Sequence, residues 1–244
     1  MAQERRQQYL AAIGIDLWVP RAARAQPAVA VSASLAPPPP AAAAAPAADA
    51  AAWEALRTQV LQCTKCPLHL TRTQGVFGVG PKRADWLVIG EAPGAEEDRR
   101  GEPFVGAAGQ LLDAMLRAIG LDRATNVYIA NMLKSRPPGN RDPKPEEIAA
   151  CLPYLQRQIE LLRPKIMLAV GRIAAQSLLG TQAPLGRLRG EVHRFGDTPL
   201  VVTYHPAYLL RTPAEKRKAW EDLKFARSVY QQLTQGSVTD GNRA

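Results

Sequence analysis

The sequence predicts an α/β fold, a three-layer α/β/α sandwich with a central four-stranded parallel sheet. Four short apolar segments, at residues 86–89, 127–130, 166–170 and 200–203, have the continuous hydrophobicity of strands buried on both faces. Helical patterns lie between them, and strands that alternate with helices form parallel sheets with right-handed crossovers. A disordered N-terminal tail is expected before the sandwich, because residues 20–50 are dominated by Ala and Pro.

The helical patterns divide the chain into three parts. The helices of the folded part are expected at residues 51–62, 109–119, 145–162, 172–179 and 212–233. We therefore expect a domain over residues 51–235, followed by a disordered C-terminal tail over residues 236–244. Residues 1–50 combine the Ala/Pro-rich linker with a short amphipathic helix at residues 4–13, which either docks on the domain, binds a protein partner or is weakly ordered.

The charge balance indicates a polyanionic partner. The chain of 244 residues has a formal net charge of +9, and residues 1–50 hold four Arg against three acidic residues. An excess of +8 therefore belongs to the remainder, which favours nucleic acid, although a merely solvated basic surface accounts for it equally well. No apolar run approaches the roughly 20 residues of a membrane span, and no signal-peptide pattern begins the chain, so a cytoplasmic protein without membrane association is expected.

Three cysteines are the candidate metal ligands. Cys63 and Cys66 have the spacing of a short ligand pair, and Cys151 follows far along the chain. Three thiols are too few, and odd in number, for a secreted disulfide scaffold. A zinc ion or an iron–sulfur cluster bound by cysteines alone needs four of them, so a redox dithiol or plain buried thiols remain open.

The segment G-E-A-P-G-A-E-E-D, at residues 90–98, is the first candidate ligand loop. It follows the apolar segment 86–89 directly, and open α/β sheets bind their ligands at the carboxyl ends of the strands. Its two glycines leave the backbone accessible beside the carboxylates of Glu91 and Glu97. An ordinary strand-to-helix loop with Asp98 as a helix cap is an alternative of equal weight.

Three further side chains are candidates for the same site. Phe104 lies in the loop G-E-P-F-V-G, where an aromatic ring either covers the core or stacks on a flat ligand. Asn131 comes directly after one predicted strand and His205 two residues after another, so both are expected at the sheet edge that carries Glu91. The alternative for Asn131 is that its amide caps the following loop.

Residues beside these loops are candidate DNA contacts. Leu209 and Leu210 are expected to be exposed next to Arg211, which suits a wedge pushed into a DNA groove with the cation on phosphate. A hydrophobic staple onto the last helix is equally consistent with the pattern. Arg136 belongs to a second basic loop, whose cations either rim a phosphate-binding surface or are solvated.

Five motifs occur in one order over about residues 55–233. They are Cys63-x-x-Cys66, G-E-A-P-G-x-E-E-D at 90–98, G-x-P-F-V-G-x-A-G-Q-L-L at 101–112, N-x-x-K-x-R-P-P-x-N-R from Asn131 and H-P-A-Y-L-L-R from His205. The set resembles the iron–sulfur uracil-DNA glycosylases called family 4. This resemblance implies a monofunctional DNA repair glycosylase that flips deoxyuridine out of double- or single-stranded DNA and hydrolyses its N-glycosidic bond, releasing uracil and leaving an abasic site.

The resemblance also implies a role for each site residue. Glu91 would stabilise the cationic sugar and orient or deprotonate water, Asn131 would read the edge of uracil, and His205 would donate a hydrogen bond to its 2-oxo oxygen. Phe104 would stack on the base, and Glu97 would crowd its 5-carbon and so disfavour thymine. The residues expected to bind uracil are Gly90, Gly94, Glu97, Phe104, Asn131 and His205. Those expected to bind DNA, in a protein that acts as a monomer, are Arg136, Leu209, Leu210 and Arg211.

One position departs from the family pattern. The family has a cysteine as fourth cluster ligand where this chain has Ser135. Either Ser135 is a weaker oxygen ligand of the cluster, or one iron is open, or the site loses or replaces its metal. We expect a retained iron–sulfur cluster of the [4Fe-4S] type with a structural role, held by Cys63, Cys66 and Cys151.

Two other functions remain as alternatives. A non-catalytic iron–sulfur DNA-binding or scaffold protein of the same fold is consistent with Ser135 and with the long linker. A nucleotide-binding protein that uses Gly90–Gly94 for phosphate is a weaker alternative, because the segment carries acids where anion sites need amide hydrogens and cations. The presence of Glu91, Phe104, Asn131 and His205 favours the enzyme, since a binding module does not need this set.

Overall fold

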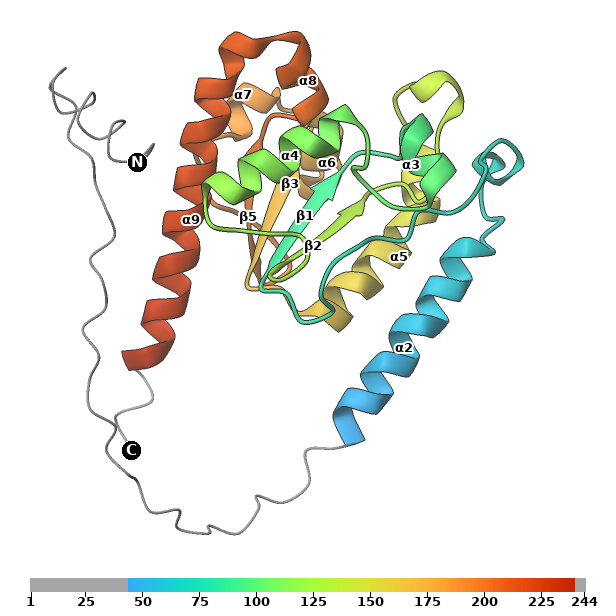
Figure 1. Ribbon diagram of the computed structural model, residues 1–244, viewed down its shortest axis with the longest axis horizontal. Coiled ribbons are helices and arrows are strands. Elements are labelled where there is room, and N and C mark those ends of the chain that lie inside the picture. The colour runs from blue at the N-terminus through green and yellow to red at the C-terminus, as the bar shows by residue number, and fades with distance from the viewer. Residues whose placement is uncertain (1–43, 240–244) are drawn as a thin grey trace, which may run out of the picture. The chain divides into compact units, whose positions relative to one another are not determined.

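A five-stranded sheet forms the centre of the protein (Figure 1). The computed structural model describes residues 44–239, so the expectations for the amphipathic helix, most of the linker and the last residues of the C-terminal tail lie outside the described residues. The strands, in the spatial order β2-β1-β3-β5-β4, are β2 (Val127–Asn131), β1 (Trp86–Gly90), β3 (Ile166–Val170), β5 (Thr198–Thr203) and β4 (His193–Phe195). The first four are parallel, as the sequence predicts.

The fifth strand, β4, corrects the expected number of four. It pairs antiparallel with β5 at the edge of the sheet through a two-residue Gly196-Asp197 turn. Gly196 has a φ of +55°, which suits the tight hairpin turn. None of the three residues of β4 is fully buried, so the strand has no apolar run by which it could be recognised.

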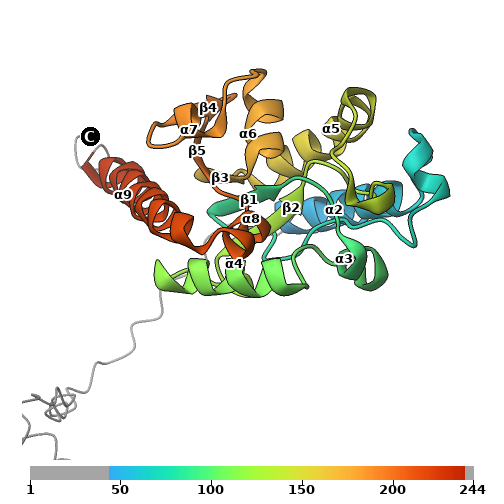
Figure 2. The same ribbon diagram turned by 90° about the horizontal axis from the view of Figure 1, so that it is seen from above.

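Helices cover both faces of the sheet and give the predicted three layers (Figure 2). Helices α4 (Ala107–Ala118) and α9 (Lys216–Thr239) lie on one face, while α2 (Ala44–Leu61), α5 (Pro145–Leu162) and α6 (Arg172–Leu179) lie on the other. Alternate strand residues face the two layers: Leu87 and Ile89 pack in the cluster that contains α2 and α5, whereas Trp86 and Val88 pack in the one that contains α4 and α9. This alternation buries both faces, which explains why the strands read as continuous apolar runs.

Short helices account for most of the differences from the predicted elements. The sequence did not indicate α3 (Ala95–Arg100), α7 (Leu185–Leu188) or α8 (Pro206–Arg211), nor the 3-10 turns Pro67–Leu70, Pro138–Asn140 and Pro213–Glu215. Because α8 and the last of these turns occupy residues 206–215, α9 begins at Lys216 rather than at residue 212. Helix α2 begins at Ala44, seven residues before the expected start. The domain boundaries at 51 and 235 stay a prediction.

No helix within residues 44–239 combines the length and the apolar character needed to cross a membrane.

Candidate active site

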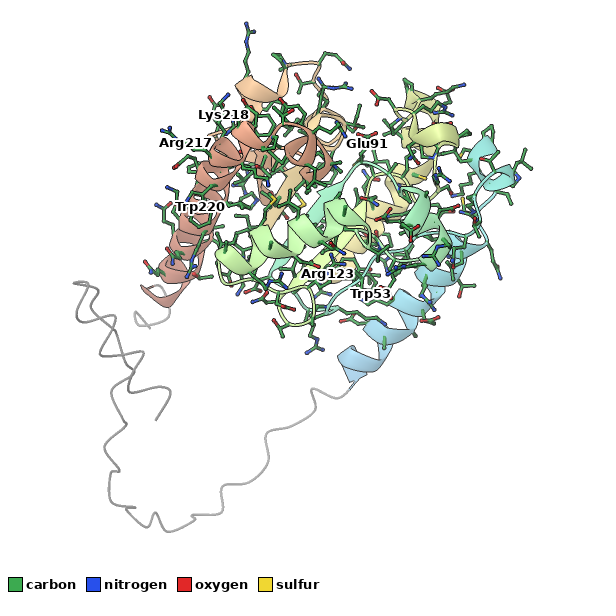
Figure 3. The ribbon with its side chains drawn as sticks, turned by 45° about the horizontal axis from the view of Figure 1, so that its top comes forward. Trp53, Glu91, Arg123, Arg217, Lys218 and Trp220 are labelled. Carbon is green, nitrogen blue, oxygen red and sulfur yellow. The ribbon has the colours of Figure 1, made fainter. Side chains whose placement is uncertain are left out.

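A pocket of about 400 Å³ opens at the carboxyl ends of β1, β2 and β5. Seven of the residues singled out in the sequence line it: Glu91, Gly94, Glu97, Phe104, Asn131, His205 and Arg211. Figure 3 shows Glu91 at this upper edge of the sheet. Arg136, Leu209 and Leu210 are not among the lining residues. The parallel sheet thus brings together side chains that lie up to 120 positions apart in the sequence, as its topology predicts.

Gly90 lies beside the pocket and leaves room for the side chains of Phe104 and Asn131. A Cβ atom at this position would be 2.5 Å from Cζ of Phe104 and would also collide with Oδ1 of Asn131. The last residue of β1 therefore has to be glycine for the Phe104 ring and the Asn131 amide to approach each other. Gly90 shapes the pocket without being among its lining residues.

The amide of Asn131 is poised to receive a donor. Asn131 is the last residue of β2, its side chain is 2% exposed, and its Oδ1 atom has no hydrogen-bond partner among the described residues. An unpaired buried acceptor destabilises a protein, so such atoms are rare unless a ligand or water completes them. Since Oδ1 borders a pocket, a donor group on a bound ligand would satisfy it.

The ring of His205 is held as a neutral donor. Its Nδ1 atom accepts a hydrogen bond from the backbone N–H of Ala207 at 3.1 Å, so the proton of the neutral ring is on Nε2. Burial, with a smaller contribution from Arg211, lowers the pKa of His205 to about 4, and Glu97 opposes this shift only weakly. The ring lies 5.7 Å from that of Phe104, between ring centroids. His205 is therefore uncharged near pH 7 and can donate through Nε2.

Gly171, which follows β3, leaves room for His205 to approach closely. It has a φ of +100°, and a Cβ atom there would be 2.9 Å from Cβ of His205. The chain can make this close approach only with glycine.

Among the carboxyl groups that line the pocket, Glu91 has the most strongly shifted pKa. Burial, and to a lesser extent the negative charge of Asp142, raise the pKa of Glu91 to about 7, against the opposing effect of Arg172. Asp142 and Arg172 form an ion pair of 2.7 Å. A carboxyl group with a pKa near neutrality in a pocket is typical of a functional acid or base. No motif indicated Arg172 as a site residue, although it follows Gly171 just after a predicted strand, the same kind of position as those of Asn131 and His205.

The carboxylate of Glu97 joins two loops of the pocket. Its Oε2 atom accepts a hydrogen bond from the N–H of Gly94 at 3.1 Å, and its Oε1 atom accepts from those of Val105 and Gly106 at 2.9 and 3.0 Å. The turn after β1 and the loop that carries Phe104 are therefore tied together by one side chain. The family resemblance implies for Glu97 only a place beside the base, whereas this bridging role follows from tertiary contacts alone.

Asp98 does not cap helix α3. It lies inside the helix, whose N-cap is Gly94, and its buried carboxylate accepts hydrogen bonds from the N–H groups of Thr73 at 3.0 Å and Gln74 at 3.4 Å. The helix-cap alternative is therefore wrong, because the carboxylate anchors a distant loop instead of its own helix.

The two leucines of α8 have opposite environments. Leu209 is 1% exposed, borders a small apolar hollow beside Met115 and Leu223, and thus packs α8 against α4 and α9. Leu210 is 43% exposed. The expectation that both are exposed is wrong for Leu209, because a helix turns consecutive side chains about 100° apart. Arg136, the cation of the second basic loop, donates a hydrogen bond from Nε to Oδ1 of Asn140 at 2.7 Å.

The three cysteines lie in one region beside Ser135. Cys66 and Cys151 pack with Leu68 and Leu133 in a single small cluster. Burial raises the pKa of the Cys151 thiol, and the nearby Cys63 and Cys66 also raise it, which reflects three thiols in electrostatic contact. Within residues 44–239 no three His, Cys, Asp or Glu side chains are close enough to hold a single metal ion. The donors present at this site are three thiols, one fewer than a cluster bound by cysteines alone requires.

Ser135, which lies beside the three cysteines, is hydrogen-bonded to Arg72. Ser135 is buried, and its Oγ atom accepts a hydrogen bond from Nη1 of Arg72 at 2.8 Å. The Nη2 atom of Arg72 donates to the carbonyl groups of Leu61 and Cys63 at 2.8 and 3.0 Å. Arg72 thus satisfies carbonyl groups at the end of α2 and joins them to Ser135, a contact that no sequence motif indicates.

Comparison with known proteins gives consistent matches over this part of the chain. The family model described as the Uracil DNA glycosylase superfamily matches residues 77–224. A Type-4 uracil-DNA glycosylase of Archaeoglobus fulgidus is 46% identical over 174 residues, which are 68% of this chain and 87% of that protein. The corresponding protein of Thermotoga maritima is 42% identical over 179 residues, or 72% and 93% of the two chains. A Type-5 uracil-DNA glycosylase of Thermus thermophilus is 34% identical over 153 residues, or 53% and 68%.

Proposed function

The chain belongs to the Uracil DNA glycosylase superfamily, and Type-4 uracil-DNA glycosylases are among its relatives. We propose that this monofunctional uracil-DNA glycosylase flips deoxyuridine out of DNA and hydrolyses its N-glycosidic bond. Uracil leaves and an abasic site remains. The observation that carries the proposal is the pair formed by the unpartnered Oδ1 atom of Asn131 and the protonated Nε2 of His205, which border one pocket with the Phe104 ring. A flipped base needs such a pocket, because chemistry at its sugar cannot occur inside the stacked duplex.

Recognition of uracil is assigned to Asn131. Its Oδ1 atom would accept the ring imide hydrogen of uracil, and its Nδ2 atom would donate to the 4-oxo group. Cytosine presents the opposite pattern at these two atoms and would leave the buried amide unpaired. The empty acceptor at Oδ1 supports this role, since it is the atom that cytosine could not satisfy.

Departure of the base is assigned to His205. Negative charge grows on the 2-oxo oxygen as the bond to the sugar breaks, and Nε2–H would donate a hydrogen bond to that oxygen. One donor placed in this way in a dry site contributes about 3–4 kcal/mol of transition-state stabilisation. A pKa of about 4 keeps His205 neutral, so this step needs no proton transfer from the ring.

The sugar and the attacking water are assigned to Glu91. Its carboxylate would stabilise the positive charge that develops on the sugar and would orient or deprotonate the water. Only the ionised form can do this, and the raised pKa of about 7 makes the ionised fraction sensitive to pH in the neutral range. Burial, the cause of the shift, also strengthens the interaction between the carboxylate and a cationic sugar.

The remaining pocket residues are assigned to binding and exclusion. Phe104 would stack on the flipped base, and base–aromatic stacking is worth about 1–3 kcal/mol. Gly90 and Gly94 keep the floor and the wall of the pocket open to the base, and Glu97 would crowd the methyl group of thymine. The three backbone hydrogen bonds to Glu97 support its exclusion role, because they hold its side chain in one place.

Contacts with the rest of the DNA are assigned to the loops around the pocket. Arg211 lines the pocket and Arg136 lies in the loop beside it, so both would bind phosphate groups. Leu210, exposed on α8, would enter the space that the flipped nucleotide leaves. Leu209 is buried and is left out of this role. We further propose that the protein acts as a monomer in the cytoplasm and that its N-terminal segment binds a protein partner.

An iron–sulfur cluster is also part of the proposal. Cys63, Cys66 and Cys151 would hold a [4Fe-4S] cluster through three thiolates, while Ser135 remains bound to Arg72. The cluster would stabilise the fold, since hydrolysis of this bond transfers no electron. It would join the end of α2 to the segment that leads from Asn131 to α5.

One assay tests the enzyme against the alternative of a non-catalytic DNA-binding protein. A labelled oligonucleotide with a single uracil is incubated with the full chain and then treated with alkali, which cleaves the strand at an abasic site. We expect cleavage at the uracil, no cleavage of the matched thymine oligonucleotide, and loss of cleavage in Glu91→Gln. Binding of the oligonucleotide without cleavage, at pH values on both sides of 7, would favour the non-catalytic alternative.

A further inference from the structure

Phe104 has a backbone conformation that a bulky residue rarely adopts. Its φ is +54°, in the left-handed region, and its ring is 6% exposed. A residue with a Cβ atom is strained there and keeps this conformation only when its surroundings impose it. The direction of the ring depends on φ, so whatever imposes this value also decides how the ring is presented to the pocket.

Charged side chains hold the peptide groups on both sides of Phe104. On the C-terminal side, the N–H groups of Val105 and Gly106 donate to Glu97. On the N-terminal side and at Phe104 itself, the carbonyl groups of Pro103 and Phe104 accept from Nη1 and Nη2 of Arg123 at 3.2 and 2.9 Å. The strained residue is thus fixed through four hydrogen bonds.

Arg123 is itself held in place by helix α4. Its Nε atom donates to Oδ1 of Asp113 at 2.7 Å, and both side chains are largely buried, 21% and 30% exposed. Figure 3 shows Arg123 beside α4. The same helix approaches the loop closely, because a Cβ atom on Gly109 would overlap the carbonyl oxygen of Phe104. A planar guanidinium with donors on three nitrogens suits this geometry, which a lysine cannot reproduce.

We propose that Arg123 is a positioning residue for uracil recognition, which holds the carbonyl groups of Pro103 and Phe104 so that the strained Phe104 presents its ring to the flipped base. Arg123 does not line the pocket and belongs to none of the five motifs. Its effect passes through the backbone of Phe104, whose ring packs near His205 and borders Gly90. This inference rests on the proposed function.

The test compares Arg123→Met, Arg123→Lys and the control Arg157→Met. Arg157 forms a similar ion pair with Glu160, but both side chains are exposed on α5. For each full-length protein, the inhibition constant of free uracil, kcat/KM on a single-uracil oligonucleotide, affinity for uracil-free DNA and thermal unfolding are measured. In Arg123→Met we expect the inhibition constant of uracil to rise and kcat/KM to fall by about tenfold, as for partial loss of a base–aromatic stack. Arg123→Lys should recover part of this loss, Arg157→Met should equal the wild type, and affinity for uracil-free DNA should not change.

A double-mutant cycle with Phe104→Ala separates positioning from a general structural role. If Arg123 acts through Phe104, Arg123→Met should have almost no further effect on uracil inhibition in the Phe104→Ala background. Additive effects, or an inhibition constant within about twofold of the wild type in Arg123→Met, would overturn the inference. If Arg123→Met does not fold, Asp113→Asn, which removes the anchor and keeps the arginine, is read by the same criteria. A wild-type chain that binds but does not cleave uracil DNA contradicts the proposed function instead.

Discussion

The Oγ atom of Ser135 accepts a hydrogen bond from Nη1 of Arg72, and the two residues are 63 positions apart in the sequence. The resemblance of the motifs to family 4 implies a fourth cluster cysteine at the position of Ser135. Through Arg72 it is joined to the carbonyl groups of Leu61 and Cys63, beside the first two thiols. A hydrogen-bonded contact thus connects segments that a fourth cluster ligand would otherwise connect through iron.

Ser135→Cys is expected to increase the iron that the protein retains. A fourth thiolate completes the ligand set of a [4Fe-4S] cluster, whereas the wild type offers three. Iron content and the visible absorbance of anaerobically purified proteins are compared, together with loss of iron in air. The wild type should contain iron that is lost faster than in Ser135→Cys. Stoichiometric zinc, or no metal in either protein, would contradict the proposed cluster.

Arg72→Met should lower the free energy of unfolding by about 2 kcal/mol through lost charge-assisted hydrogen bonds, as measured by urea unfolding.

The activity of the enzyme is expected to rise with pH around neutrality. Glu91 has a pKa of about 7 and acts in its ionised form, so kcat/KM should increase through pH 7 and level off above it. The lowered pKa of His205, about 4, keeps that ring neutral over the same range and adds no second inflection. Glu91→Gln should lose at least about 100-fold in kcat/KM and should lose the inflection near pH 7. A wild-type profile that is flat between pH 6 and 8 would remove Glu91 from its assigned role.

Glu91 is also expected to destabilise the fold at alkaline pH. Its pKa is raised from 4.5 to about 7 in the folded protein, so the folded state binds the proton more tightly than the unfolded state does. The stability that the neutral carboxyl group supports is therefore complete below pH 4.5 and is lost as the pH rises through 7. Glu91→Gln should match the wild type near pH 4.5 and exceed it by about 1–2 kcal/mol at pH 8, a value discounted for the partial exposure of the group. Denaturant unfolding at the two pH values measures the difference.

Gly90→Ala is expected to impair uracil binding. The added methyl group would collide with the Phe104 ring and the Asn131 amide, so the two recognition groups must separate. We expect kcat/KM to fall by about 10- to 100-fold through lost stacking and hydrogen bonding, with a cost of about 1–3 kcal/mol in stability. Gly186→Ala is the matched control, because a Cβ atom at Gly186 meets nothing within 4 Å. Equal activity of the two variants would show that the pocket tolerates the methyl group.

The two leucines of α8 are expected to respond oppositely to truncation. Leu209→Ala removes a fully buried side chain and should lower the free energy of unfolding by about 2–4 kcal/mol. Leu210→Ala should change stability by less than about 0.5 kcal/mol but should reduce kcat/KM on double-stranded uracil DNA several-fold. Its effect on single-stranded substrate should be smaller, since no duplex has to be opened. A Leu210→Ala variant with wild-type activity on both substrates would remove the wedge from the mechanism.

The sequence alone determined the four parallel strands and placed the candidate site residues at one edge of the sheet. Its four continuous apolar runs predicted β1, β2, β3 and β5 to within two residues, because strands buried on both faces carry no polar alternation. Parallel pairing then requires the residues after these strands, such as Asn131 and His205, to meet at one edge of the sheet. The hydrophobic pattern of a strand and the topology of a parallel sheet follow general rules. Predicting them therefore does not require knowing which side chains contact one another.

The tertiary structure decided the contacts that no pattern encodes. The edge strand β4, the burial of Leu209 and the anchoring of Asp98 to a distant loop each depend on what packs against them. The same is true of Arg72 and Arg123, whose partners lie 63 and 19 positions away. A hydrophobic pattern shows which face of an element is buried, whereas the direction of an arginine fork or a strained φ is fixed only when distant backbone groups are brought within hydrogen-bond distance.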